Sequence, residues 1–214
     1  MKPLVSVLLP VRDAVSTLSA CLDSIANQSL ARHEVIAVDD GSSDGTSEIL
    51  SARADLDPRI RFVKIPPTGL VGALNYGLSI AQSSLVARMD ADDWMHPRRL
   101  QAQFEGMAER PDCVVLGTRV RTAASDDLTG GMREYLAWQN ACVTPLQLAA
   151  DVFLEAPFTH PAVMFRRAQI MAAGGYRSGP FPEDYELWLR LHANGARFAK
   201  LSAKLLHWRQ SSTS

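Results

Sequence analysis

Two acidic loops contain the side chains whose types and spacing could do chemistry. One is Asp39-Asp40-Gly41-Ser42-Ser43-Asp44-Gly45 and the other is Asp90-Ala91-Asp92-Asp93. The second loop places three carboxylates within four residues, and each like-charged pair costs about 3–4 kcal/mol at ~4–6 Å and an effective dielectric near ~20. A divalent cation would remove this penalty, and oxygen ligands suit Mg²⁺ or Mn²⁺ together with substrate phosphates. The second loop therefore predicts a metal site for a phosphorylated ligand.

Each loop also has a structural interpretation. The second could consist of exposed carboxylates at a strand end, with Asp93 stabilising the N-terminus of the next helix. The first could be a strand-to-helix turn in which Asp44 caps the helix. A hydrogen bond from a nucleobase or ribose hydroxyl to Asp40 is compatible with that turn. For the second loop we favour the functional interpretation.

A third acidic pair, Glu183-Asp184, opens an expected helix. Acids at a helix N-terminus stabilise the helix dipole by about 0.3–1 kcal/mol each, which is the structural interpretation. The functional one makes Asp184 a general base that deprotonates a hydroxyl. Near the end of the chain, His207 and Arg209 flank Trp208. This segment is either a partly buried aromatic edge or a cation and a metal ligand that meet a diphosphate.

Alternating strand and helix patterns must position these side chains. Continuous apolar runs predict buried strands at 4–9 and 35–38, and further strands are predicted at 60–65, 85–89 and 113–116. Helical spacing predicts helices at 16–28, 46–54, 69–82 and 98–109, and we expect Ser16 to cap the first. The alternation predicts an α/β fold with a doubly wound, mostly parallel sheet. Ligands bind such a sheet at the carboxyl ends of its strands, where both acidic loops would lie.

Beyond Gly117 the pattern changes to a smaller, mixed part of the same domain. Residues 118–131 are polar and turn-rich, which predicts a functional loop. We expect helices at 145–153, 167–173 and 185–193, and strands at 162–165 and within 198–208. His160 precedes one of these strands and could line an acceptor site.

Composition and local motifs exclude several classes of protein. The 214 residues include 22 Lys+Arg and 23 Asp+Glu, so the formal net charge is −1, which argues against a nucleic-acid partner. The three cysteines form no C-x-x-C pair and fit small buried side chains. The segment after the first strand, 10–14, lacks the G-x-G-x-x-G of dinucleotide-binding enzymes. Because no apolar run is long enough to span a bilayer, we expect a soluble, cytoplasmic protein.

Five motifs occur together and in order. They are Val5-Ser6-Val7-Leu8-Leu9-Pro10, Asp39 to Thr46, Arg88-Met89-Asp90-Ala91-Asp92-Asp93, Gly174-Gly175-Tyr176 and Glu183-Asp184-Tyr185-Glu186-Leu187-Trp188. In this combination, over nearly the whole chain, the sequence resembles the family 2 glycosyltransferases. The resemblance implies the GT-A fold, a Rossmann-like sheet with a nucleotide-sugar-binding half (1–117) and an acceptor-binding half (118–214).

The resemblance also implies an activity and its residues. It implies inverting, metal-dependent transfer of a sugar from a nucleotide-diphosphate donor, with a UDP-sugar as first candidate, to a saccharide or lipid-linked acceptor. Polysaccharide or glycolipid assembly is the implied process, with peripheral association with the inner face of the membrane left open. The implied donor-binding residues are Pro10, Val11, Asp13, Asp40, Asp90, Asp92 and Arg209. The implied ligands for Mg²⁺ or Mn²⁺ are Asp92, Asp93 and His207, and the implied catalytic residues are Asp184, as base, and Glu183.

Two other functions remain as alternatives. A sugar-nucleotide nucleotidyltransferase also uses paired aspartates and Mg²⁺, but usually has a Gly-rich basic loop where this chain has 11–15. The other is a nucleotide-sugar-binding module without turnover, against which the intact acidic loop and Glu183-Asp184 argue.

Overall fold

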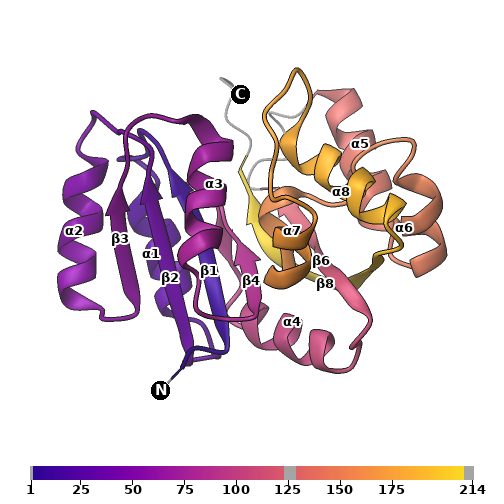
Figure 1. Cartoon of the computed structure of the whole chain (residues 1–214), viewed down its shortest axis with the longest axis horizontal. Helices are drawn as coiled ribbons and strands as arrows, with labels where there is room; N and C mark the ends of the chain where they lie inside the picture. Colours follow the sequence, from indigo (N-terminus) through magenta and orange to yellow (C-terminus); the bar gives the residue numbers. More distant parts are fainter. Residues whose placement is uncertain (1, 123–128, 210–214) are drawn as a thin grey trace.

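The computed structural model describes residues 2–122 and 129–209, which form one eight-stranded sheet covered by helices (Figure 1). The strands are β1 (Val5–Val11), β2 (His33–Asp39), β3 (Ile60–Lys64), β4 (Leu85–Arg88), β5 (Trp94–Met95), β6 (Cys113–Thr122), β7 (Val163–Arg166) and β8 (Arg197–Trp208). Their order across the sheet is β3-β2-β1-β4-β7-β6-β8-β5. The chain thus builds a single sheet from both of its halves.

The first half of the sheet is parallel and the second half is mixed. Strand β1 pairs in parallel with β2 and β4, and β2 pairs in parallel with β3. Strand β7 then runs antiparallel to both β4 and β6, while β8 is parallel to β6 and antiparallel to β5. The predicted α/β fold with a smaller mixed C-terminal part is therefore confirmed. The boundary that we expected at Gly117 falls inside β6.

Helices cover both faces of the sheet because side chains of β1 alternate between them. Helices α1 (Leu18–Ala26), α2 (Thr46–Leu56) and α4 (Arg99–Ala108) pack on the face that contains Val7 and Leu9. Helices α3 (Gly69–Ile80), α6 (Pro145–Asp151), α7 (Arg167–Ala172) and α8 (Glu183–Ala193) pack on the face that contains Leu8. Figure 1 shows α3 and α7 in front of the sheet. These two apolar layers hold the carboxyl ends of the strands in place.

The predicted loop at 118–131 is wrong at both of its ends. Strand β6 continues to Thr122, and helix α5 (Gly130–Ala141) begins where Gly130 and Gly131 indicated a turn. The Thr129 side chain caps α5 by accepting a hydrogen bond from the Met132 N–H at 3.3 Å. A capping residue thus outweighs the low helix propensity of the two glycines. Residues 123–128 lie outside the described residues.

One smaller expectation also fails, and one strand was not predicted. Helix α1 begins at Leu18 with Thr17, not Ser16, at the N-cap position, and Thr17 makes no side-chain capping bond. The two-residue strand β5 has no signal of its own, because only pairing with β8 makes it a strand.

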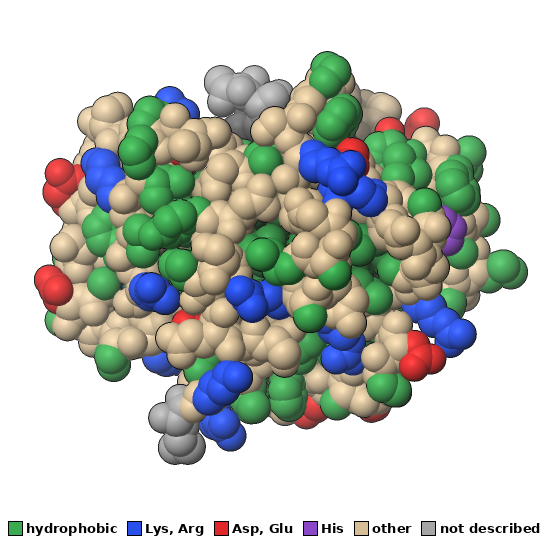
Figure 2. All heavy atoms as spheres, in the orientation of Figure 1, with side chains coloured by type: hydrophobic (Ala, Val, Ile, Leu, Met, Phe, Trp, Pro, Cys, Tyr) green, Lys and Arg blue, Asp and Glu red, His purple; other side chains and the backbone are tan. Residues whose placement is uncertain are grey.

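The surface carries charges of both signs. On the face shown in Figure 2, the Lys and Arg side chains are scattered and do not form one continuous patch. Within the described parts of the chain, no helix combines the length and the apolar character that crossing a bilayer requires.

Candidate active site

Three carboxylates converge directly after β4. One oxygen from each of Asp90, Asp92 and Asp93 lies within 4.8 Å of the others. Asp93 is buried, with 1% of its surface exposed, and one of its oxygens accepts a 2.6 Å hydrogen bond from the Arg209 N–H. Its other oxygen is buried and has no hydrogen-bond partner among the described residues. Burial, and then the charge of Asp90, raise the pKa of Asp93 to about 8.

Buried arginines partly compensate this negative charge. Arg88, at the end of β4, forms an ion pair with Asp90 and is 3% exposed. Arg99, in α4, is fully buried and donates a 2.8 Å hydrogen bond to the Arg88 carbonyl oxygen. Burial lowers the pKa of Arg99 to about 9. The Cys21 thiol donates to the Asp90 carbonyl oxygen at 3.2 Å.

The cluster formed by Asp90, Asp92 and Asp93 fits a hard divalent cation. Its donors are all oxygens, which Mg²⁺ and Mn²⁺ prefer, and the buried oxygen of Asp93 without a partner among the described residues would be satisfied by a cation or a proton. Burial, and then the charge of Asp90, also raise the pKa of Asp92. The site therefore carries the electrostatic strain that the sequence predicts.

The end of β8 lies beside the three aspartates. Trp94 pairs with His207 across β5 and β8, and their rings stack with centroids 4.6 Å apart. His207 does not belong to the cluster of Asp90, Asp92 and Asp93, so its role as a metal ligand stays a prediction. The Arg209 guanidinium lies 5.7 Å from the centre of the Trp94 ring. Through its backbone N–H, Arg209 also fixes the orientation of Asp93.

A cavity of about 250 Å³ brings Asp90 together with Glu183 and Asp184. Its further lining residues are Arg88, Tyr135, Leu136, Gln139, Phe158, Thr159, His160, Pro161 and Trp208. Helix α8 begins at Glu183, so both acids stand at its N-terminus as the sequence predicts. The cavity therefore joins segments that lie far apart in the chain.

The two acids of α8 have different surroundings. A Glu183 oxygen lies 3.3 Å from Nδ1 of His160. Burial acts to raise the pKa of Glu183, but the interaction with His160 outweighs it, and the pKa lies below its usual value. Asp184 accepts a 2.8 Å hydrogen bond from the Tyr185 N–H. Among the described residues, Asp184 has no other hydrogen-bond partner, so it is the less engaged carboxylate.

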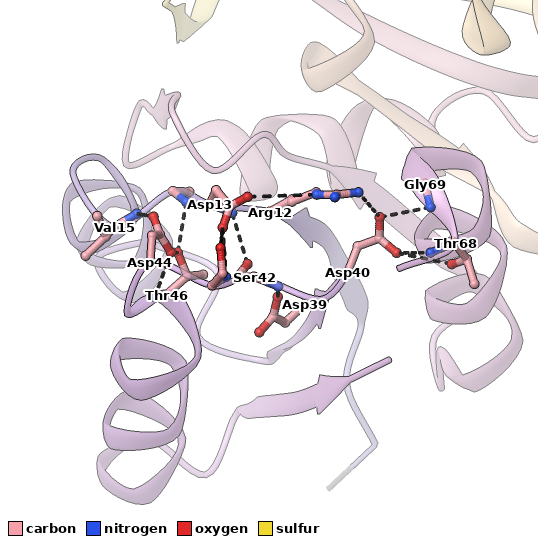
Figure 3. Close-up of polar contacts among 12 residues, drawn as sticks. Arg12, Asp13, Val15, Asp39, Asp40, Ser42, Asp44, Thr46, Thr68 and Gly69 are labelled. Carbon is pink, nitrogen blue, oxygen red and sulfur yellow. Dashed lines mark hydrogen bonds and ion pairs between the residues drawn. The ribbon is translucent and has the colours of Figure 1, made fainter. Parts of the chain in front are cut away.

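The first acidic loop connects the ends of β1, β2 and α3 (Figure 3). Asp40 is 2% exposed and points toward the N-terminus of α3, where it accepts hydrogen bonds from the Thr68 and Gly69 N–H groups at 2.6 and 2.9 Å. Arg12 reaches Asp40 from the other side, with 3.6 Å between the charged atoms. Asp40 therefore has a clear structural role, and its predicted contact with a nucleobase stays a prediction.

The other residues of this region form a hydrogen-bonded turn. Asp13 has a left-handed backbone (φ 45°), and its carboxylate accepts a 2.8 Å hydrogen bond from the Ser43 N–H. Asp44 accepts hydrogen bonds from the Thr46 and Val15 N–H groups, each at 3.0 Å. The N-cap position of α2 belongs to Gly45, so Asp44 supports the turn one residue before the cap position that we predicted for it. The predicted donor-binding residues Pro10 and Val11 are buried at the end of β1, beside this turn.

Some residues of this site have no clear sequence signal. Arg12 is a single exposed cation in the sequence, and only the fold places it beside Asp40. Tyr135 and Gln139 belong to α5, which the sequence did not predict, and they line the cavity beside Asp184. A larger cavity of about 610 Å³ lies elsewhere, near Arg110 and Arg197, and contains no predicted site residue. We place the site at the smaller cavity because the carboxylates meet there.

Comparisons with known proteins show the family to which the chain belongs. Residues 6–171 match the family model described as Glycosyl transferase family 2. The amylovoran biosynthesis glycosyltransferase AmsE of Erwinia amylovora is 31% identical over 202 residues, which cover 94% of this chain and 73% of that protein. The UDP-Gal:alpha-D-GlcNAc-diphosphoundecaprenol beta-1,3-galactosyltransferase of Escherichia coli is 31% identical over 217 residues, covering 98% and 75%.

Solved structures share the fold at lower identity. S. aureus TarS 1–349 in complex with UDP-GlcNAc matches with a TM-score of 0.78 at 18% identity, covering 99% of this chain and 59% of that one. The mannosyltransferase PcManGT from Pyrobaculum calidifontis, in complex with GDP-Man and Mn²⁺, has a TM-score of 0.73 at 20% identity, covering 94% and 55%. The chain thus spans less than two thirds of either solved chain.

These findings decide between the functions that the sequence left open. The predicted GT-A fold is confirmed by the two structures, and the family match excludes the nucleotidyltransferase alternative. The family model covers most of the chain, and the relatives align over nearly all of it. The chain therefore belongs to glycosyl transferase family 2 and is a glycosyltransferase.

Proposed function

We propose that this enzyme transfers a sugar, with inversion, from a nucleotide-diphosphate donor to a hydroxyl of a saccharide or lipid-linked acceptor. The observation that carries the proposal is the cavity of about 250 Å³, which both Asp90 and Asp184 line. Asp90, which belongs to the acidic cluster proposed for the diphosphate, and Asp184, proposed to take the hydroxyl proton, thus line the same cavity. This arrangement suits a single displacement between two bound substrates.

The relatives support the substrate classes. One relative is named for UDP-Gal and a diphosphoundecaprenol acceptor, and another for amylovoran biosynthesis. We therefore assign this enzyme to polysaccharide or glycolipid assembly, with a UDP-sugar as the first donor to test. A lipid-linked acceptor would bring a cytoplasmic enzyme to the inner face of the membrane, which co-sedimentation with anionic vesicles would test.

The donor is proposed to bind along the ends of β1, β2 and β4. The residues that contact it are Pro10, Val11, Asp13, Asp40, Asp90, Asp92 and Arg209. Asp40 already accepts three hydrogen bonds from Thr68 and Gly69. Because a carboxylate offers about four acceptor positions, a nucleobase N–H would take the remaining one. The contact therefore requires the nucleobase to lie close to Arg12 and α3.

Asp92 and Asp93 are the residues that would hold Mg²⁺ or Mn²⁺, with His207 as a further predicted ligand. When bound, the cation would neutralise the negative charge that develops on the leaving diphosphate. Arg209 keeps Asp93 oriented through its backbone N–H, and Arg88 keeps Asp90 in place as an ion pair. These contacts pre-organise the carboxylates before the donor arrives.

Asp184 is proposed to act as the general base, beside Glu183. It takes the proton of the acceptor hydroxyl as that oxygen bonds to the anomeric carbon, while the bond from this carbon to the diphosphate oxygen breaks. Attack from the face opposite the diphosphate inverts the anomeric centre, and no covalent enzyme intermediate forms. Asp184 lies in the first turn of α8, where acidic side chains stabilise the helix N-terminus.

Replacement of the base tests the proposal. We expect Asp184→Asn to lower kcat by about 10²–10⁴, with nucleotide affinity changed less than about threefold. Asp112→Asn is the matched control, because Asp112 is exposed and pairs with Arg197 away from the site. Equal activity of Asp184→Asn and the control contradicts the proposed base.

A donor panel tests the substrate class. UDP-, GDP- and dTDP-sugars are added with and without Mn²⁺, and thermal unfolding is followed. At a hundredfold excess over Kd, binding adds about 2.7 kcal/mol, which corresponds to about 5–10 °C for a chain of this size. We expect a Mn²⁺-dependent shift with the UDP-sugar. A shift with none of the donors contradicts the proposal.

A further inference from the structure

A chain of hydrogen bonds connects α3 to the acids of α8. The side chain of Asn75, in α3, donates to the Tyr176 carbonyl oxygen and accepts from the Tyr176 N–H, each at 2.9 Å. The Tyr176 hydroxyl lies 2.9 Å from Nε2 of His160. Nδ1 of His160 lies 3.3 Å from the Glu183 carboxylate. The chain thus runs from Asn75 through Tyr176 and His160 to Glu183.

The inner members of this chain are held rigidly. Tyr176 is 3% exposed and His160 is 8% exposed. Gly175 has a left-handed backbone (φ 69°), and a Cβ atom there would lie 2.5 Å from the Asn75 side-chain oxygen. Only glycine therefore permits this approach of α3 to the Tyr176 backbone. The His160 ring also meets Trp188 edge-to-face, at 6.0 Å between centroids.

The hydrogen bonds determine which atoms carry protons. The pKa of Glu183 lies below its usual value, so this residue is a carboxylate at neutral pH and can only accept. Nδ1 of His160 must then donate, and in the tautomer that carries its proton on Nδ1 the Nε2 atom is an acceptor. Burial raises the pKa of Tyr176, so its hydroxyl keeps the proton and donates to Nε2. Every group in the chain is satisfied by one tautomer of His160.

We propose that Tyr176 and His160 are positioning residues for glycosyl transfer, which hold the Glu183 carboxylate toward His160 and leave Asp184 to accept the acceptor proton. This role rests on the function proposed above. Glu183 and Asp184 are both carboxylic acids, adjacent in sequence, and they line the same cavity. Neither their functional group nor their position in the chain therefore shows which of them is the base. The contact with Nδ1 of His160 distinguishes them, because of the two acids Glu183 makes it and Asp184 has only the Tyr185 N–H among the described residues.

The tautomer can be measured without any substrate. The protein has five histidines, so ¹⁵N-histidine NMR of the donor-free protein, with His160→Gln for assignment, resolves each ring. We expect His160 to carry its proton on Nδ1. A proton on Nε2 overturns the proposal, because Nδ1 could then not donate to Glu183.

Steady-state kinetics test the positioning role. We expect Tyr176→Phe to lower kcat about 10–100-fold, as loss of an orienting partner does elsewhere, with donor KM changed less than about threefold. Tyr76→Phe is the matched control, since Tyr76 is 39% exposed on α3 and lies outside the hydrogen-bonded chain. His160→Gln, whose amide both donates and accepts, should retain more activity than His160→Ala.

A comparison of the two acids completes the test. Glu183→Gln should lower kcat much less than Asp184→Asn, because the amide oxygen still accepts from Nδ1. Equal losses in these two variants, or an unchanged kcat in Tyr176→Phe, overturn the positioning role alone. Absence of transfer by the wild-type enzyme overturns the proposed function, and this role with it, whatever the tautomer of His160.

Discussion

The acidic loop after β2 and the acidic loop after β4 differ in how their carboxylates are satisfied. In the first, Asp39, Asp40 and Asp44 each accept at least one hydrogen bond from a backbone N–H. In the second, the oxygens of three aspartates lie within 4.8 Å of one another, and one buried oxygen of Asp93 has no partner among the described residues. Both loops follow parallel strands at the same edge of the sheet.

The difference shows that acidic residues at a strand end are not equivalent. Carboxylates that receive N–H groups stabilise the turn that holds them, so the first loop is a rigid support. Carboxylates that face one another destabilise the protein until a cation or a proton arrives. The second loop is therefore the better candidate for a metal, and the first for fixing the walls of the donor site.

The largest effect should come from removing one charge of the second loop. Asp93→Asn keeps an oxygen that can accept from the Arg209 N–H, but loses a ligand that stabilises several kcal/mol of developing charge. We expect kcat to fall by about a hundredfold or more. Titration with Mn²⁺ in the presence of UDP checks the cause, with Asp112→Asn as control. Unchanged Mn²⁺ dependence contradicts the assignment of Asp93.

A change in the first loop should have a smaller effect, and this effect should be on stability. Asp40→Ala leaves the N–H groups of Thr68 and Gly69 without their buried acceptor. Such a loss costs about 2–4 kcal/mol of unfolding free energy. Urea unfolding measures it, with Asp112→Ala as the exposed control. If both variants unfold at the same urea concentration, the first loop is not the rigid support described here.

The two loops should also respond to pH with opposite signs. The pKa of Asp93 is raised to about 8 in the folded protein, mainly by burial. Between about 4 and 8 the folded state therefore binds more protons, and unfolding free energy falls as pH rises, by at most about 1.4 kcal/mol per pH unit. Urea unfolding in chelator should show this fall in the wild-type protein and much less of it in Asp93→Asn.

Asp39 should behave in the reverse way. Burial acts to raise its pKa, but hydrogen bonds from Ser42 and Ser47 outweigh it, and the pKa lies below its usual value. This residue therefore contributes stability above its unfolded pKa and loses it as pH falls through the folded value. The stability difference between the wild-type protein and Asp39→Asn should therefore shrink as pH falls below about 4. A difference that grows as pH falls through this range would falsify this sign.

The smallest effect should come from Arg12. Its side chain is 56% exposed, and its ion pairs with Asp40 and Asp13 measure 3.6 and 3.9 Å. Exposed pairs of this kind contribute about 0–1 kcal/mol and weaken in salt. Arg12→Ala should therefore change unfolding free energy by less than about 1 kcal/mol, and the change should shrink at high salt. A larger loss means that Arg12, and not Asp40 alone, supports the end of α3.

Much of the fold could be predicted from local patterns. The apolar runs around Leu8, Ile36 and Val86 predict buried parallel strands, because both faces of such a sheet are covered. The helix at Gly130 could not be predicted in this way, since its capping residue Thr129 lies among turn residues. Strand β5 could not be predicted at all, because pairing with β8 creates it.

In the candidate site, too, some features could be predicted from the sequence and others could not. The crowding of Asp90, Asp92 and Asp93 follows from their spacing, and the structure confirms it. The pair Glu183-Asp184 was predicted at a helix start, which is also confirmed. The partners of these acids were not predictable, because His160 and Arg209 lie far from them in the chain.

The sequence by itself determined most of the order of strands and helices, with β5 and α5 as the exceptions, together with the crowded carboxylates and the family. These depend on neighbours within a few residues or on motifs in order, so they can be read without coordinates. Only the tertiary structure decided that Asp40 supports α3, that Asp184 shares a cavity with Asp90, and that His160 engages Glu183. Such contacts depend on side chains from separate elements, and packing of both faces of the sheet brings them together.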